Sequence, residues 1–181
     1  MSGLGHFAAG FAAKAAAPEV PLWVLLAASE TNDILYFLFT STGVEQKAAM
    51  TMDFEHGVRY LAPVVSPWSH GLFMSVIWSL AAGLIAFLVY RNGRTAGVIG
   101  LTVFSHWLLD LVMHANLPVF FDKSMRLGLG LENSGAGLLF MTILDLLLLG
   151  VGIVIYWNAQ KRKAIDFIGN KQKNVLDAEK R

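Results

Sequence analysis

The sequence predicts an all-α fold, a polytopic membrane helix bundle of about four transmembrane helices with a short N-terminal helical segment. Of the 181 residues, 55% are hydrophobic and only 15% are charged, which is more apolar surface than a soluble domain of this size carries. The apolar residues gather in four stretches of about 20 residues, the length that crosses ~30 Å of hydrocarbon. These stretches are 21–40, 70–90, 96–117 and 135–157.

The segment before the first stretch, residues 3–17, is rich in Ala and Gly and is too short to span a bilayer comfortably. It could form a half-helix, a re-entrant piece, an interfacial helix or a short fifth span. At the other end, residues 161–181 are polar and of mixed charge, which is typical of a solvated helix or a frayed end. We therefore divide the chain into a transmembrane helical domain, 1–160, and a polar cytoplasmic tail, 161–181.

The basic residues predict the orientation of the helices, because Lys and Arg gather on the cytoplasmic side of a membrane. Arg91 and Arg94 lie in a tight turn between the second and third stretches, and the basic residues 161–163 follow the fourth directly. Both places, and both termini, should be cytoplasmic, which puts loops 41–69 and 118–134 on the outer side. The net charge of only +1 argues against nucleic acid as a partner, and the absence of Cys excludes disulfides and thiolate chemistry.

Six ionisable residues lie inside the apolar stretches, where each costs about 2.5–3.5 kcal/mol on insertion scales. They must therefore face one another, water or a metal ion rather than lipid. A packing network satisfied by neighbouring hydroxyl groups is the structural alternative to a functional site. The six are Glu30 and Asp33 in the first stretch, His106, Asp110 and His114 in the third, and Asp145 in the fourth.

The third stretch carries its three groups at i, i+4 and i+8, so His106, Asp110 and His114 share one helix face. His106 and Asp110 are one turn apart and could hold one cation together. His106 and His114 are separated by about 12 Å along the helix axis, so one ion cannot readily take all three groups. Either two metal ions bind there, or one histidine supports or catalyses instead. Asp145 could orient a histidine without binding the ion.

His70 stands at the outer mouth of the second stretch, and the predicted topology places His114, Asp110 and Asp33 in the outer half of the membrane as well. These side chains can therefore converge. Imidazole and carboxylate together are the ligand set of Zn²⁺ and similar divalent ions. Asp33 and its neighbour Glu30 lie on one face within one turn, and they could be ligands or a proton or cation relay.

Several motifs along the chain resemble those of a known family. They are Gly5-His6-Phe7, an Asp in the first stretch, Ser69-His70-Gly71, Phe104-Ser105-His106-Trp107-Leu108-Leu109-Asp110, and the run from Leu127 to Ser134. They are similar to the LexA-regulated, YdjM-like family of inner-membrane metal-dependent hydrolases. The resemblance covers residues 4–157, and its strongest motif, Ser-His-x-x-x-Asp in an apolar stretch, is moderately specific.

This resemblance implies a hydrolase of the bacterial inner membrane whose metal site is likened to that of zinc-dependent phospholipase C. The metal ligands that it implies are His6, Asp33, His70, His106 and Asp110.

The chain departs from the family pattern in its first and second spans. The family often has Pro-Asp-x-Asp in the first span, whereas here Asn32-Asp33 is followed by two apolar residues. Glu30 is the candidate replacement for the missing acid. The His-Arg-Gly element that often precedes the second span is absent, and Trp68 stands in that region. His6 reaches a site in the outer half of the membrane only if the N-terminal segment tucks into the bundle.

Together these residues predict a membrane-embedded metal-dependent hydrolase that uses a divalent metal, zinc above all. A phospholipid or another amphipathic phosphoester is the expected substrate, because a site in the outer half of a bilayer meets lipid first. Glu30 or His114 would be the general base for the water that attacks. Lys123 and Arg126 form a cation pair that could hold an anionic head group, the alternative being ordinary contact with the membrane surface.

Two other functions would use the same residues. In a transporter or channel-like protein they would form a cation or proton path. Four spans are few for that role and no inverted repeat or pair of half-helices is evident in the sequence, although a homo-oligomer could supply the missing spans. In a structural membrane protein the polar groups would only join helices.

Overall fold

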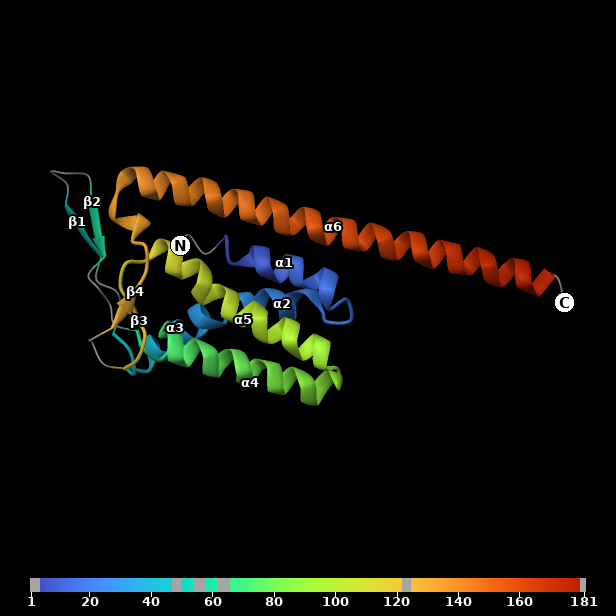
Figure 1. Cartoon of the computed structure of the whole chain (residues 1–181), viewed down its shortest axis with the longest axis horizontal. Coiled ribbons are helices and arrows are strands. Elements are labelled where there is room, and N and C mark those ends of the chain that lie inside the picture. Colours follow the sequence, from blue (N-terminus) through green and yellow to red (C-terminus); the bar gives the residue numbers. More distant parts are fainter. Residues whose placement is uncertain (1–3, 47–49, 54–57, 62–65, 122–124, 180–181) are drawn as a thin grey trace.

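The computed structural model describes residues 4–46, 50–53, 58–61, 66–121 and 125–179. Its helices are α1 (Phe7–Ala16), α2 (Leu22–Ser29), α3 (Thr31–Ser41), α4 (Leu72–Tyr90), α5 (Gly93–Met113) and α6 (Gly135–Glu179), with one 3₁₀ turn, η1 (Leu131–Asn133). Two short antiparallel pairs, β1 (Met50–Asp53) with β2 (Val58–Leu61) and β3 (Leu117–Pro118) with β4 (Arg126–Leu127), lie together at one end of the helices (Figure 1). The predicted all-α fold is confirmed.

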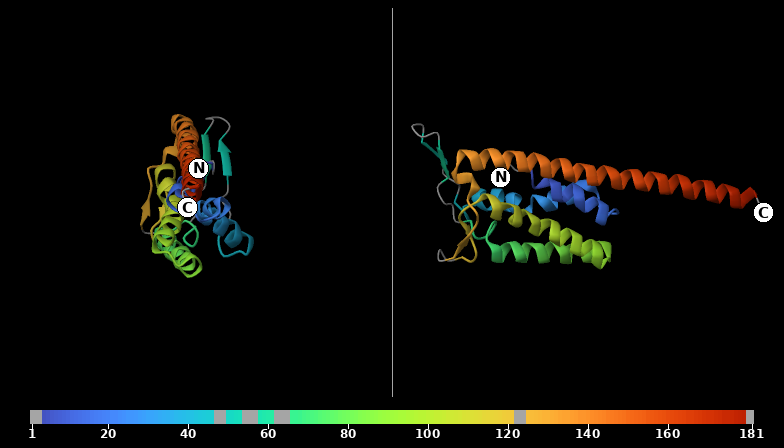
Figure 2. Two further views of the ribbon diagram at one scale, coloured as in Figure 1. Left: turned by 90° about the vertical axis from the view of Figure 1, so that its right-hand side faces the viewer. Right: turned by 45° about the horizontal axis from the view of Figure 1, so that its top comes forward.

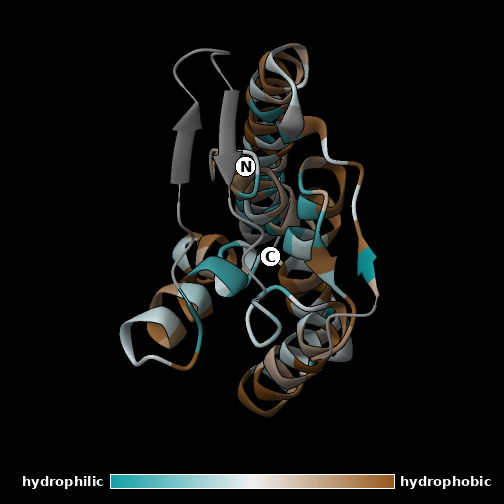
Figure 3. Ribbon diagram, turned by 90° about the vertical axis from the view of Figure 1, so that its left-hand side faces the viewer, coloured by the Kyte–Doolittle hydropathy of each residue, from teal (hydrophilic) through white to brown (hydrophobic). Residues whose placement is uncertain are grey.

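Among the described residues, three helices are long and apolar enough to cross a membrane: α4, α5 and the Gly135–Gly169 part of α6. Helices α2 and α3 meet the same criterion together but are bent by 62°, so they form either a re-entrant loop or one broken span, which would bring the number to four. Large apolar side chains such as Leu80 and Leu101 are about 70% exposed, as lipid-facing residues are. Figure 3 shows the apolar ribbon over much of the spanning helices. The chain is therefore an integral membrane protein, as predicted.

The break in the first span lies at Glu30, whose backbone (φ −103°, ψ 9°) leaves the helical region. The residues on either side carry hydroxyl groups that bind the last carbonyls of α2. Ser29 Oγ donates to the Leu26 carbonyl at 2.8 Å, and Thr31 Oγ1 donates to the Ala28 carbonyl at 3.0 Å. Such local bonds compete with the helix ladder and satisfy carbonyls that lipid could not. The bend places Glu30 inside the bundle rather than on a continuous helix.

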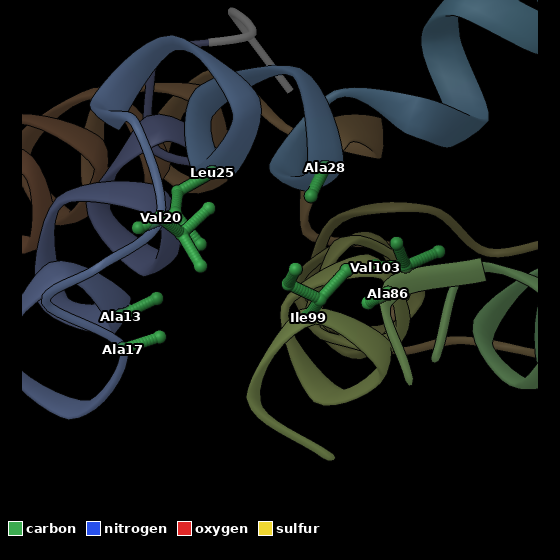
Figure 4. Close-up of a cluster of buried hydrophobic side chains, with 8 residues drawn as sticks. All are labelled: Ala13, Ala17, Val20, Leu25, Ala28, Ala86, Ile99 and Val103. Carbon is green, nitrogen blue, oxygen red and sulfur yellow. The ribbon is translucent and has the colours of Figure 1, made fainter. Parts of the chain in front are cut away.

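Helix α1 tucks into the bundle, where it packs on α6, α2 and α5 (Figures 1 and 2). Small residues permit the close approach. A Cβ at Gly152 of α6 would lie 2.6 Å from the Ala8 carbonyl oxygen, and a Cβ at Gly10 would lie 2.8 Å from the Leu25 carbonyl oxygen. The structure shows a ten-residue helix packed against the bundle, and which of the predicted alternatives it forms relative to the membrane stays a prediction. A cluster of buried apolar residues joins α1 and α2 to α4 and α5 (Figure 4).

The loop that joins α1 to α2 is tied to the end of the bundle that carries the basic turn. Both Lys14 and Lys163 donate to the Pro18 carbonyl, and Lys14 also donates to the Val20 carbonyl. The Glu19 carboxylate accepts from the Thr95 hydroxyl at the start of α5. The basic residues on which the orientation rests therefore lie at one end of the molecule, and which side of the membrane that end faces stays a prediction.

The turn between α4 and α5 forms where the sequence predicted it. Arg91 ends α4 in the left-handed conformation (φ 54°), and the Asn92 side chain caps α5 by accepting from the Arg94 and Thr95 backbone N–H groups. Helix α6 does not end with the fourth span, because it continues as one helix to Glu179 and extends past the other helices (Figure 1).

Candidate metal centre

The structure brings the predicted ligands together from separate elements. They are His6 at the start of α1, Asp33 in the first turn of α3, His70 just before α4, and His106 and Asp110 on α5. Because α1 is tucked into the bundle, His6 at its start lies beside Asp110. Lys14, eight residues after His6, lies at the basic end of the bundle. The condition that the sequence placed on His6 is therefore met.

Asp110 lies at the middle of the cluster, and its side chain is 2% exposed. Its Oδ2 lies 3.4 Å from His106 Nε2 and 3.5 Å from His70 Nε2. Its Oδ1 lies 3.3 Å from His6 Nε2 and 3.6 Å from His114 Nε2. One carboxylate thus faces four imidazoles, two on each oxygen.

Asp33 forms the more open side of the cluster, with a side chain that is 46% exposed. Its Oδ1 lies 3.3 Å from His70 Nε2 and 3.7 Å from His106 Nε2, and its Oδ2 lies 3.9 Å from His6 Nδ1. Glu30 lies next to this group, with Oε2 4.0 Å from His6 Nδ1. Glu30 and Asp33 therefore lie on one side of the cluster and His106 and Asp110 of α5 on the other. His6 and His70 lie between them.

These distances fit shared binding of a cation better than direct hydrogen bonding. An N–H···O bond is usually about 2.9–3.0 Å long. Two ligands of one tetrahedral zinc ion, each at about 2.0–2.2 Å, are instead about 3.3–3.6 Å apart. Several of the facing atoms are buried and have no hydrogen-bond partner: His6 Nδ1 and Nε2, His106 Nε2, Asp110 Oδ2 and Glu30 Oε1. Buried polar atoms of this kind are costly when they have no partner, and imidazole and carboxylate are ligands of divalent metals, so the residues fit a divalent metal ion.

Among the residues that the structure describes, two sets of ligand atoms lie close enough to hold a metal ion, each with all its atoms within 4.8 Å of one another. One set is His6, Glu30, Asp33 and His106, and the other is His70, His106 and Asp110. His106 belongs to both sets. Its Nδ1 faces the Ser29 carbonyl, so only its Nε2 is available, and that atom can bind one ion from one set or the other. The geometry therefore keeps open both the one-ion and the two-ion arrangement that the sequence allowed.

The Nδ1 atoms of three histidines are held by groups outside the ligand sets. His106 Nδ1 lies 2.8 Å from the Ser29 carbonyl, His114 Nδ1 lies 2.8 Å from Glu132 Oε2, and His70 Nδ1 lies 2.9 Å from Ser69 Oγ. In each case Nε2 faces Asp110. Partners of this kind fix the tautomer and the ring orientation of histidines that bind metal. The sequence analysis did not identify these partners.

His114 caps the end of α5 and lies outside both ligand sets. The chain returns to it through two glycines in the left-handed region. Gly130 N donates to the His114 carbonyl, and a Cβ at Gly128 (φ 138°) would lie 1.7 Å from that oxygen. This close return brings Glu132 of η1 to the His114 ring. Glu132 belongs to the run that carried the family resemblance, which is the signal that could have pointed to it.

Two further sequence predictions remain untested. Asp145 is buried in α6, and its role in orienting a histidine stays a prediction. Arg126 lies in β4, whereas Lys123, its proposed partner in holding a head group, is outside the described residues.

No protein-family model, curated protein or solved structure matches this chain. The family resemblance read from the motifs therefore stays a prediction.

Proposed function

We propose that this chain is a membrane-embedded, metal-dependent hydrolase that acts on a phospholipid or another amphipathic phosphoester. The observation that carries the proposal is the convergence of buried nitrogen and oxygen atoms, from His6, His106 and Asp110, that have no hydrogen-bond partner. Groups placed only to join helices would be expected to satisfy one another. A divalent cation, most simply zinc, would satisfy them together.

A zinc ion bound among these residues would polarise a phosphoryl oxygen and lower the pKa of a water molecule beside it. The chain supplies the rest of the chemistry. His106 and Asp110, both almost fully buried, would hold the ion in a fixed place. Asp33, which is half-exposed, would leave one side of the centre open to substrate, as catalytic zinc sites require.

Two residues are placed to move protons. Glu30 Oε1 is buried without a hydrogen bond next to His6, and it would accept a proton from the attacking water. His114 is bound through Nδ1 to Glu132 and turns Nε2 towards Asp110. It would be the alternative base, or it would give a proton to the leaving group.

The surroundings of Asp33 support an amphipathic substrate. Ile34 and Phe37 follow it on α3, and both are more than half exposed. Phe37 stands one turn after Asp33 and so lies on the same side of the helix. An acyl chain could lie on this apolar surface while the phosphoryl group reaches the carboxylate. The resemblance to inner-membrane hydrolases is consistent with this proposal, and a bacterial inner membrane is the location that we propose with it.

A transporter-like function is the second candidate, and one observation favours it. The first span is broken by 62°, and an acid, Glu30, sits at the break. Broken helices that expose ion-binding groups in mid-membrane are typical of secondary transporters. The same histidines and acids would then pass a cation or a proton.

Metal content separates these functions. The full-length protein, purified in detergent, would be analysed by elemental mass spectrometry beside His106→Ala, Asp110→Asn and a control, Asp166→Asn, in the exposed part of α6. We expect near-stoichiometric zinc in the wild type and the control and its loss in the two site variants.

Hydrolysis of phosphoester bonds in phospholipid vesicles should likewise be seen in the wild type and the control and be lost in the two site variants. A folded wild type that takes up no zinc, or zinc content that both site variants retain, would overturn the hydrolase. Ion flux in proteoliposomes without bound zinc would support transport.

A further inference from the structure

A buried carboxylate, Glu45, stands behind His70 on the side away from the metal centre. Glu45 follows α3, and its backbone N–H is tied to the Phe39 carbonyl at the end of that helix. Its Oε1 accepts from the Trp68 N–H at 2.8 Å and the Ser69 N–H at 3.0 Å, and its Oε2 accepts from Ser69 Oγ at 2.6 Å. Glu45 is 6% exposed and Ser69 is fully buried. All the donors to this carboxylate come from the turn that carries His70.

The number of protons fixes the direction of each bond in this chain. A serine hydroxyl has one proton, and a carboxylate can only accept, so the Ser69 proton points to Glu45. The Ser69 oxygen, 2.9 Å from His70 Nδ1, must then accept from the ring. Nδ1 of a neutral His70 therefore carries its hydrogen, and Nε2 carries the lone pair. That lone pair faces Asp33 Oδ1 at 3.3 Å and Asp110 Oδ2 at 3.5 Å.

We propose that Glu45 and Ser69 are positioning residues that hold His70 in the tautomer with hydrogen on Nδ1, so that Nε2 is free to bind the metal. The inference rests on the proposed metal centre for its purpose, but the tautomer itself can be measured without metal. Glu45 touches neither the ligands' coordinating atoms nor the open side of the site. Glu45 acts on His70 through the Ser69 hydroxyl. Carboxylates behind metal-binding histidines have the same orienting effect when they accept from the ring directly.

The backbone of the turn that carries His70 is held by its own contacts. The hydrogen bonds of Ser69 and Glu45 therefore act on a ring whose position is already set. His70 N donates to the Ser66 carbonyl, and a Cβ at Gly71 would lie 2.3 Å from the Pro67 carbonyl oxygen. Trp78 Nε1 donates to the Trp68 carbonyl at 2.7 Å and joins the turn to α4. The backbone therefore sets the place of the ring, and Glu45 with Ser69 sets which nitrogen is free.

Replacing Glu45 by Gln tests this arrangement, because the change keeps the shape of the side chain and turns the acceptor that faces Ser69 Oγ into a donor. If the Gln oxygen accepts from the Trp68 and Ser69 N–H groups, its NH₂ group faces the Ser69 oxygen and can only donate. The Ser69 proton then turns towards His70 Nδ1 and favours the tautomer with hydrogen on Nε2. Ser69→Ala removes the acceptor altogether and is the second variant should Glu45→Gln fail to fold.

The experiment is ¹⁵N NMR of the full chain in detergent, labelled at histidine and stripped of metal, with His70→Asn used to assign the His70 signal. We expect the Nδ1–H tautomer in the wild type and a shift towards Nε2–H in Glu45→Gln and Ser69→Ala. Zinc affinity should fall roughly tenfold or more in both variants, as it does when such supporting partners are removed. Ser79→Ala is the matched control, because Ser79 Oγ also makes a 2.6 Å bond, to the Gly100 carbonyl, away from His70.

The outcomes separate this inference from the proposed function. A wild type with hydrogen on Nε2, or variants that keep the Nδ1–H tautomer, would overturn the role of Glu45 and Ser69 even if zinc binds. A tautomer change in the variants, in a wild type that binds no zinc, would support the positioning role and refute the metal centre.

Discussion

His106 Nδ1 lies 2.8 Å from the carbonyl oxygen of Ser29, the last residue of α2. This bond joins the break between α2 and α3 to His106, the histidine within α5. Because a carbonyl can only accept, His106 carries a hydrogen on Nδ1, and the Nε2 lone pair of the neutral ring faces Asp110. The end of α2 therefore orients a candidate ligand, while the residue after it, Glu30, contributes its carboxylate to the same centre.

Gly152 tests whether α1 must be tucked in for the centre to form. A Cβ there would lie 2.6 Å from the Ala8 carbonyl oxygen, so Gly152→Ala should push α1 and His6 outwards. We expect a destabilisation of about 1–3 kcal/mol, typical of overpacking, and weaker zinc binding. Gly150→Ala is the control, since a Cβ at Gly150 meets nothing within 4 Å. Thermal unfolding and competition with a zinc-chelating dye measure both effects, and equal behaviour of the two variants would refute the dependence on α1.

Gly128 tests the approach of Glu132 to His114. Gly128→Ala places a Cβ in a backbone conformation (φ 138°) that disfavours it and only 1.7 Å from the His114 carbonyl oxygen. The loop must move, at a cost of about 1–3 kcal/mol, and the bond between His114 and Glu132 should be lost. Because His114 lies outside both ligand sets, we expect phosphoesterase activity to fall while zinc content is unchanged. Gly135→Ala, which meets nothing nearby, should keep both; loss of zinc in Gly128→Ala would contradict the separation.

Zinc should stabilise the folded protein, because the ligands are assembled only in the folded state. At a free zinc concentration of about 100 times Kd the gain is about 2.7 kcal/mol. Thermal unfolding in detergent, with zinc and with chelator, should therefore show a higher Tm with zinc for the wild type. His106→Ala should show little or none of this increase. An equal increase in both proteins would mean that zinc binds elsewhere.

Glu19 predicts a pH-dependent contribution to stability at the basic end. The hydrogen bond from the Thr95 hydroxyl, helped by the Glu19 backbone N–H, lowers the pKa of the Glu19 carboxyl below its ordinary 4.5. A lowered pKa stabilises the folded state above the unfolded pKa and loses that effect as the pH falls through the folded value. The Tm difference between wild type and Glu19→Gln should therefore be positive at pH 7 and shrink below about pH 4.5. Thr95→Val should abolish the difference; a difference independent of pH would contradict the assignment.

The sequence was sufficient for the apolar spans and for the common face of His106 and Asp110, because both follow from local spacing, whereas His6 was a candidate only through the family resemblance. Apolar stretches of membrane length become helices whatever surrounds them, and the spacing of His106 and Asp110 fixes their common face. The structure then brings His6, Asp33 and His70 to that face.

The parts that the sequence did not predict depend on contacts between distant segments. The break at Glu30 is compensated by hydroxyls and by a bond from α5, which no periodicity reveals. Glu45 lies 24 residues before Ser69 in the chain and has no motif around it. The place of α1 depends on Gly152 in α6, a helix that begins more than a hundred residues later. Such pairings are set by tertiary packing rather than by local propensity.

The position of α1 also sets an order of assembly. This helix has ten residues, too few to cross a bilayer, and its packing partners include α6, the last helix of the chain. During synthesis α1 is made long before the surface that receives it exists. The packing that holds His6 beside Asp110 can therefore form only after α5 and α6 have been made. A chain cut before α6 would lack one of the surfaces on which α1 packs, and the cluster of histidines and acids would lose part of the support for His6.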